Sequence, residues 1–111
     1  MIDAHVHIFH GNRLFTGLAH PDSIKCFGHY PSFDLTETYA TIAGALKEAG
    51  MYVEQSGGLA LNYTFYELGM NPKMLKVFKD NNVRIFTASD AHKPEHCVEN
   101  IKKLQEILDR I

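Results

Sequence analysis

Residues 51–92 read MYVEQSGGLALNYTFYELGMNPKMLKVFKDNNVRIFTASDAH and contain two short apolar segments on either side of a helical one. Residues 51–55 and 83–88 mix β-branched, aromatic and aliphatic side chains next to turn formers, which is typical of strands. The helix between them begins at Pro72, a residue suited to the first helical position, and the pair Asn81-Asn82 ends it. A strand, a helix and a strand in this order predict two parallel strands joined by a right-handed crossover.

The N-terminal half continues this alternation of strands and helices. Two further strands are predicted over residues 2–9 and 14–19, and all four strands have the apolar character of buried ones. A long helix is predicted from Asp34 or Thr36 to Gly50, because acid and hydroxyl side chains cap helix N-termini and glycine ends helices. The inner face of this helix contains Tyr39, Ile42, Ala43 and Leu46.

The C-terminal segment predicts one more helix, which begins at Pro94. Its apolar residues recur at helical spacing and are Val98, Ile101, Leu104, Leu108 and Ile111. Residues 56–70 are expected to form a loop in which Gly57-Gly58 turns the chain at positive φ. This order of elements predicts an α/β fold with about four mainly parallel strands flanked by helices, and with functional groups at the carboxyl ends of the strands.

The composition is that of one globular domain over residues 1–111, since 45% of the residues are hydrophobic and 22% are charged. A net charge of -2 gives no electrostatic footprint for nucleic acid or an anionic membrane surface, so no partner of either kind is expected. No apolar run approaches the roughly 20 residues that span a bilayer. Cys26 and Cys97 are interpreted as reduced, buried thiols and Lys25 as a surface charge, and a cytoplasmic location is expected.

Seven histidines in so short a chain indicate metal or proton chemistry. His5 and His7 lie two residues apart on a predicted strand, so their side chains point to the same side and can bind one metal ion together. The alternative is a pair of core histidines that are hydrogen-bonded to the protein. His20 directly follows the second predicted strand, where the chain leaves the carboxyl end of the sheet.

Asp90 and His92 follow the fourth predicted strand with the same two-residue spacing. Three strand ends would therefore bring five side chains to one face, namely His5, His7, His20, Asp90 and His92. Imidazole and carboxylate ligands without thiolate suit zinc, iron or manganese. A metal held there would lower the pKa of water toward about 7 and polarise a phosphoryl oxygen. Glu54, at the end of the third strand, either reaches this site or hydrogen-bonds the backbone or Asn62.

Four segments carry a resemblance to a known family. They are residues 2–7 (IDAHVH), 19–22 (AHPD), 52–59 (YVEQSGGL) and 87–92 (TASDAH). Together these segments resemble the PHP (polymerase and histidinol phosphatase) superfamily, and the spacing from His20 to the C-terminus is most similar to its histidinol-phosphatase branch. Complete family members have a long segment between the first two motifs, whereas only about a dozen residues separate them here.

The resemblance implies a partial, shortened PHP-type β/α barrel whose strand ends hold divalent metal ions. It implies that one metal is bound by His5, His7 and Asp90, a neighbouring one by His92, and a third by His20. It also implies that the substrate is a small phosphorylated metabolite, and that a metal-bound hydroxide attacks and hydrolyses its phosphate monoester. Asp90, His92 and His20 would be the catalytic residues.

Two alternatives to an active enzyme stay open at this point. The first is a catalytically silent remnant that binds metal and acts as an oligomeric or partner-binding domain. The second is a purely structural or partner-binding domain in which the histidines no longer bind metal. Four strands taken from a larger barrel leave two exposed edges, which proteins normally pair or cover. The sequence therefore predicts a homodimer or a higher homo-oligomer in which a second copy covers these edges.

Overall fold

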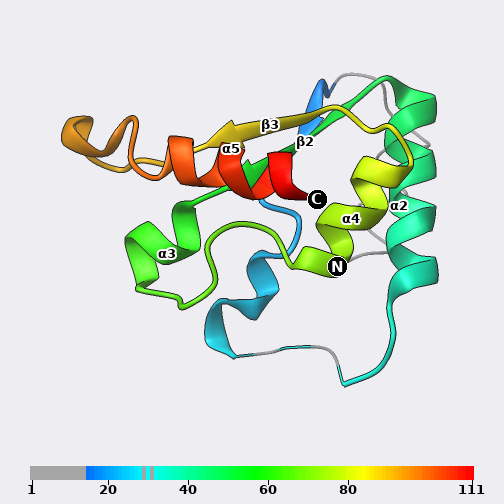
Figure 1. Cartoon of the computed structure of the whole chain (residues 1–111), viewed down its shortest axis with the longest axis horizontal. Coiled ribbons are helices and arrows are strands. Elements are labelled where there is room, and N and C mark those ends of the chain that lie inside the picture. The colour runs from blue at the N-terminus through cyan, green and yellow to red at the C-terminus, as the bar shows by residue number, and fades with distance from the viewer. Residues whose placement is uncertain (1–14, 29, 31) are drawn as a thin grey trace.

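A computed structural model of the chain describes residues 15–28, 30 and 32–111 (Figure 1). Within them, three strands form one parallel sheet in the order β1 (Gly17–Leu18), β2 (Tyr52–Ser56) and β3 (Ile85–Ala88). The predicted α/β class with parallel strands is therefore confirmed. The strand predicted over residues 2–9 lies outside the described residues, and the barrel implied by the resemblance stays a prediction.

The longest helix, α2 (Thr36–Ala49), forms where the sequence predicts it. The Asp34 side chain accepts hydrogen bonds from the backbone N–H and the hydroxyl of Thr36, which satisfies donors at the helix start. Gly50 ends the helix in the left-handed conformation that glycine adopts without strain, and its N–H donates to carbonyls of the last turn. The four residues predicted for the inner face are buried.

The second predicted helix is α4 (Pro72–Asp80), which packs against α2 (Figure 1). Asn71 caps it, because its side-chain oxygen accepts a hydrogen bond of 2.9 Å from the backbone N–H of Lys73. Leu75 and Phe78 of this helix point inward and are fully buried.

The hydrophobic core lies between one face of the sheet and the helices. Because parallel pairing places partner residues on the same face, Val53 and Ile85 share the inner face of β2 and β3. Val53 belongs to one buried cluster with residues of α2 and α4, and Ile107 and Leu108 of the last helix pack against that cluster. This layer fixes the positions of the strands and thus of the residues that follow them.

The opposite face of the sheet is only partly covered by the described residues. The Tyr52 ring lies so close to Gly17 that a Cβ at position 17 would overlap it. Phe86 packs edge-on against Tyr52, with ring centroids 5.0 Å apart, yet 53% of Phe86 is exposed. The prediction that all strands are buried is therefore wrong for β3, because no described helix covers its outer face.

The segment predicted as a loop contains a short helix, α3 (Gly58–Tyr63). Neither glycine of the Gly57-Gly58 pair turns the chain at positive φ, so that prediction is wrong. Gly57 has a φ of -90° and Gly58 is the first residue of the helix. Glycine is needed at position 58 for space, since a Cβ there would overlap the carboxylate of Asp90. Thr64, in the left-handed conformation, ends α3.

The predicted final helix is split in two. A 3-10 turn over Pro94–His96 comes first, and the helix α5 (Ile101–Arg110) starts later, after Asn100 with a φ of 62°. Val98, predicted on the apolar face, falls in the irregular segment and is 80% exposed, whereas Leu104 is fully buried as predicted. In the part of the chain that the structure describes, no helix is long and apolar enough to cross a membrane.

Candidate functional site

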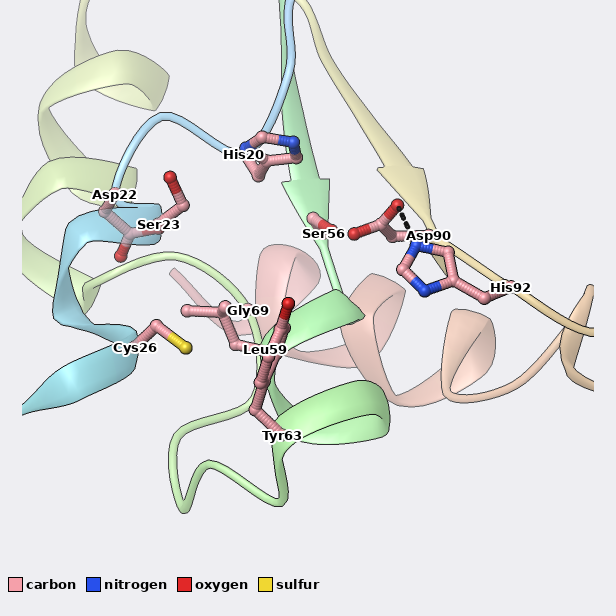
Figure 2. A pocket seen from close by; sticks show the side chains of 10 residues that line it. All are labelled: His20, Asp22, Ser23, Cys26, Ser56, Leu59, Tyr63, Gly69, Asp90 and His92. Atoms are coloured by element: carbon pink, nitrogen blue, oxygen red, sulfur yellow. Dashed lines mark ion pairs between the residues drawn. The ribbon is translucent and has the colours of Figure 1, made fainter.

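A cavity of about 350 Å³ opens at the carboxyl end of the parallel sheet (Figure 2). The segments that follow all three strands line it, because the strands run in one direction and end at one edge. His20 comes from the segment after β1, Ser56 from the end of β2, and Asp90 and His92 from the segment after β3. A 3-10 helix, η1 (Ser23–Phe27), and α3 close the other side.

Asp90 and His92 are two predicted ligands whose side chains lie next to each other. The Nε2 atom of His92 lies 3.8 Å from an Oδ1 oxygen of Asp90, and both side chains remain partly exposed to the cavity. Asp90 has a φ of 53°, a backbone conformation that aspartate tolerates better than most residues. Its carbonyl accepts a hydrogen bond of 3.0 Å from the side-chain amide of Asn62 on α3.

His20 lines the same cavity from the segment after β1 (Figure 2). Its φ of 25° is unusual for a side chain that is not glycine, and its carbonyl accepts a hydrogen bond from the N–H of Ser23 at the start of η1. Three of the five predicted site residues therefore share one cavity. His5 and His7 lie outside the described residues.

The donor chemistry of Asp90 and His92 suits a divalent metal, since a carboxylate and an imidazole within 4 Å of each other can bind one ion. Over residues 15–28, 30 and 32–111, however, no group of three or more potential metal ligands lies together. These residues thus offer a two-donor fragment of a metal site. Completing it would require further ligands.

Glu54 is not among the residues that line the cavity, and Asn62 donates to Asp90 rather than to Glu54. The residue of β2 that reaches the cavity is Ser56, whose hydroxyl oxygen accepts a hydrogen bond of 3.1 Å from the N–H of Gly58. The strand ends one residue later than predicted, so the cavity lies beside Ser56.

Six further residues line the cavity and were not among the predicted site residues, namely Asp22, Ser23, Cys26, Leu59, Tyr63 and Gly69. Cys26 is half-buried in η1, and Cys97 is exposed, so the expectation of two buried thiols is wrong, although both are unpaired. Leu59 and Tyr63 lie one helical turn apart on α3, and that helix was not predicted. No local sequence signal marks the face that α3 turns toward the strand ends.

Lys25, interpreted from the sequence as a surface charge, is buried, with only 3% of its area exposed. Its ammonium group lies 2.6 Å from the Asp22 carboxylate and 2.5 Å from that of Glu67. It also donates a hydrogen bond of 2.6 Å to the carbonyl of Gly69. The burial is tolerable because two carboxylates and a carbonyl replace the lost water. Lys25 thereby joins η1 to the segment before α4.

Tyr30 extends this buried network toward solvent. Its hydroxyl donates a hydrogen bond to the Glu67 carboxylate. Burial, followed by that hydrogen bond and the negative charge of Glu67, raises the pKa of the Tyr30 hydroxyl well above its usual range. The neutral phenol is therefore the form that the folded protein stabilises.

Gln55 of the central strand β2 is fully buried and contacts the segment that contains Gly69, a residue of the cavity lining. Its Oε1 atom accepts a hydrogen bond of 2.6 Å from the N–H of Met70, while its Nε2 atom has no partner within the described residues. Gly69 lies against this amide, since a Cβ at position 69 would come within 2.6 Å of Nε2. A side chain of β2 thus holds the segment of Gly69 and Met70 in place beside the cavity.

Comparison of the sequence with models of known protein families, with curated proteins and with solved structures finds no match.

Proposed function

We propose that the chain is a metal-dependent phosphoester hydrolase whose substrate is a small phosphorylated metabolite. The observation that carries this proposal is the presence of His20, Asp90 and His92 in one cavity at the carboxyl end of a parallel sheet. Imidazole and carboxylate groups gathered at strand ends are typical of sites that use zinc, iron or manganese. The cavity also has the size of a small-molecule site, which starts at about 300 Å³.

Asp90 and His92 are the residues that would hold the metal, because they form the two-donor fragment. A bound metal ion supplies a water of lowered pKa and neutralises charge on the phosphoryl oxygens. His20, across the same cavity, would bind a further metal ion as the family resemblance implies. The roles of His5 and His7 as additional ligands belong to the proposal and rest on the sequence alone.

Local packing keeps Asp90 in place for this role. Its backbone is restrained by the Asn62 hydrogen bond, and Gly58 leaves space for its carboxylate. A ligand held by its surroundings loses less conformational entropy when the ion binds. The left-handed conformation of Asp90 supports the same role, since residues with strained backbones cluster at functional sites.

Hydrolysis of p-nitrophenyl phosphate in the presence of zinc, iron or manganese tests the proposal. We expect turnover that requires one of these metals and falls to the buffer rate in Asp90→Ala. The matched control is Asp80→Ala, which removes an exposed carboxylate at the end of α4 that is paired with Lys76 and lies outside the cavity lining. Equal turnover in the wild type and Asp90→Ala would overturn the assignment.

A second candidate is a metal-binding domain without catalytic activity. It is favoured by the ligand count, because the described residues provide no complete group of three ligands. This candidate predicts a metal that stays bound while no phosphoester is hydrolysed. Metal binding and turnover measured on the same sample separate the two candidates.

The predicted homo-oligomer also belongs to the proposal. β1 and β3 form the two edges of the described sheet, and the outer face beside them exposes more than half of both Phe15 and Phe86. A second copy that covers this face would explain why these aromatic side chains are not buried within the described chain. Light scattering across a range of protein concentrations tests this part, and a monomer at every concentration would contradict it.

A further inference from the structure

We infer that Tyr63 is a specificity-determining residue that selects phosphoesters with a flat aromatic group. This inference rests on the proposed function and extends it from the hydrolytic groups to the rest of the cavity. The observation that carries it is the orientation of Tyr63, whose ring points from the end of α3 into the cavity (Figure 2).

The two sides of the cavity differ in chemistry (Figure 2). On the side of the strand ends lie the polar groups of His20, Asp90 and His92. On the side of α3, Leu59 and Tyr63 form a largely apolar wall. Beside η1 the lining is again polar, with Ser23 and with Asp22, whose carboxylate is paired with Lys25. A ligand that satisfies both sides has a charged group next to a flat apolar one.

Tyr63 is not needed for the core. Its side chain is 58% exposed, so little of its surface is removed from water when the chain folds. A large aromatic ring that lines a cavity and stays accessible can instead be covered by a ligand. The left-handed residue Thr64 ends α3 directly after Tyr63 and so fixes the point at which the ring leaves the helix.

The size of the cavity agrees with a ligand of two parts. About 150 Å³ is sufficient to hold a benzene molecule, and the cavity measures about 350 Å³. A phosphoryl group on the polar side and one aromatic ring against Tyr63 therefore fit together. Stacking of two aromatic rings typically changes affinity by about 2- to 12-fold.

Binding of phenylphosphonate and methylphosphonate, two stable analogues, tests the inference by calorimetry with excess manganese. We expect the wild type to prefer phenylphosphonate by about 2- to 12-fold. Tyr63→Ala should remove this preference, and Tyr63→Phe should keep it because the ring remains. Tyr66→Ala is the matched control, since Tyr66 is 81% exposed on the following segment and does not line the cavity.

The outcomes separate this inference from the proposed function. Equal affinity of the wild type for both analogues, or a preference that survives in Tyr63→Ala, would overturn the role of Tyr63 and leave the hydrolase proposal standing. Loss of the preference in Tyr63→Phe would overturn stacking as its cause. Failure of both analogues to bind the wild type would overturn the phosphoester site itself and the inference with it.

Discussion

Gly58 and Asp90 are in direct contact across the end of the sheet, and no other residue type fits at position 58 without displacing the Asp90 carboxylate. The contact joins the first residue of α3 to the segment after β3, although the two lie far apart in the sequence. The position of the Asp90 carboxylate, a candidate metal ligand, thus depends on a glycine that has no side chain to bind a metal itself.

Gly58→Ala should move the Asp90 carboxylate and weaken metal binding by about 10- to 100-fold, as changes beside metal ligands typically do. Overpacking should also lower the free energy of unfolding by about 1 to 3 kcal/mol. Metal titration and denaturant unfolding measure the two effects.

Gly44→Ala is the control, because a Cβ in this exposed position of α2 meets no other atom. Alanine there should stabilise the protein by about 0.5 to 1 kcal/mol. Unchanged metal affinity in Gly58→Ala would show that the contact does not position Asp90.

Lys25→Met should destabilise the protein by about 3 kcal/mol, because it leaves the carboxylates of Asp22 and Glu67 without their buried partner. Lys76→Met removes a lysine from an exposed pair with Asp80 and should cost only about 0.3 to 0.5 kcal/mol. Urea unfolding of both variants checks the difference. Similar losses in the two variants would mean that the network around Lys25 contributes no more than a surface ion pair.

Stability should fall at alkaline pH through Tyr30. Because the folded protein raises the pKa of this hydroxyl, the stabilisation is complete below the unfolded pKa of about 10 and is lost as the pH rises above it. Tyr30→Phe cannot ionise, so its free energy of unfolding should decrease less steeply than that of the wild type over this range. Denaturant unfolding at several pH values above neutrality gives both slopes. Parallel slopes would contradict a raised pKa of the Tyr30 hydroxyl in the folded protein.

Stability should also fall at acidic pH, through Asp34 at the start of α2. Hydrogen bonds from the side chain and then the backbone of Thr36 lower the pKa of the Asp34 carboxyl. Its stabilisation is therefore present above the unfolded pKa of about 3.9 and is lost as the pH falls through the lower folded value. Asp34→Ala should show a smaller loss of stability on acidification than the wild type. An identical acid dependence in both proteins would argue against this cap.

The helices α2 and α4 were predictable because their signals are local. The carboxylate of Asp34, the amide of Asn71 and the glycine at position 50 lie within a few residues of the helix ends that they define. Strand positions followed from short apolar segments in the same way. His20 and Asp90, which the sequence predicts to lie near each other at the strand ends, both line one cavity.

Other features depend on contacts between distant residues and could not be read from local sequence. Lys25 is buried because Glu67, 42 residues later, folds back onto it. The role of Gly58 depends on Asp90, and α3 is too short to show a helical period. The last helix starts late because Asn100 adopts the left-handed conformation. Asparagine tolerates this conformation, but an asparagine in the sequence does not by itself predict it.

Metal content per chain, measured by elemental analysis on protein purified without added metal, tests the proposed site most directly. We predict near-stoichiometric zinc, iron or manganese in the wild type, retained in Asp80→Ala and lost when Asp90→Ala and His92→Ala are combined. A wild-type protein without any of the three metals, or a double variant that retains them, would contradict the assignment of Asp90 and His92 as ligands.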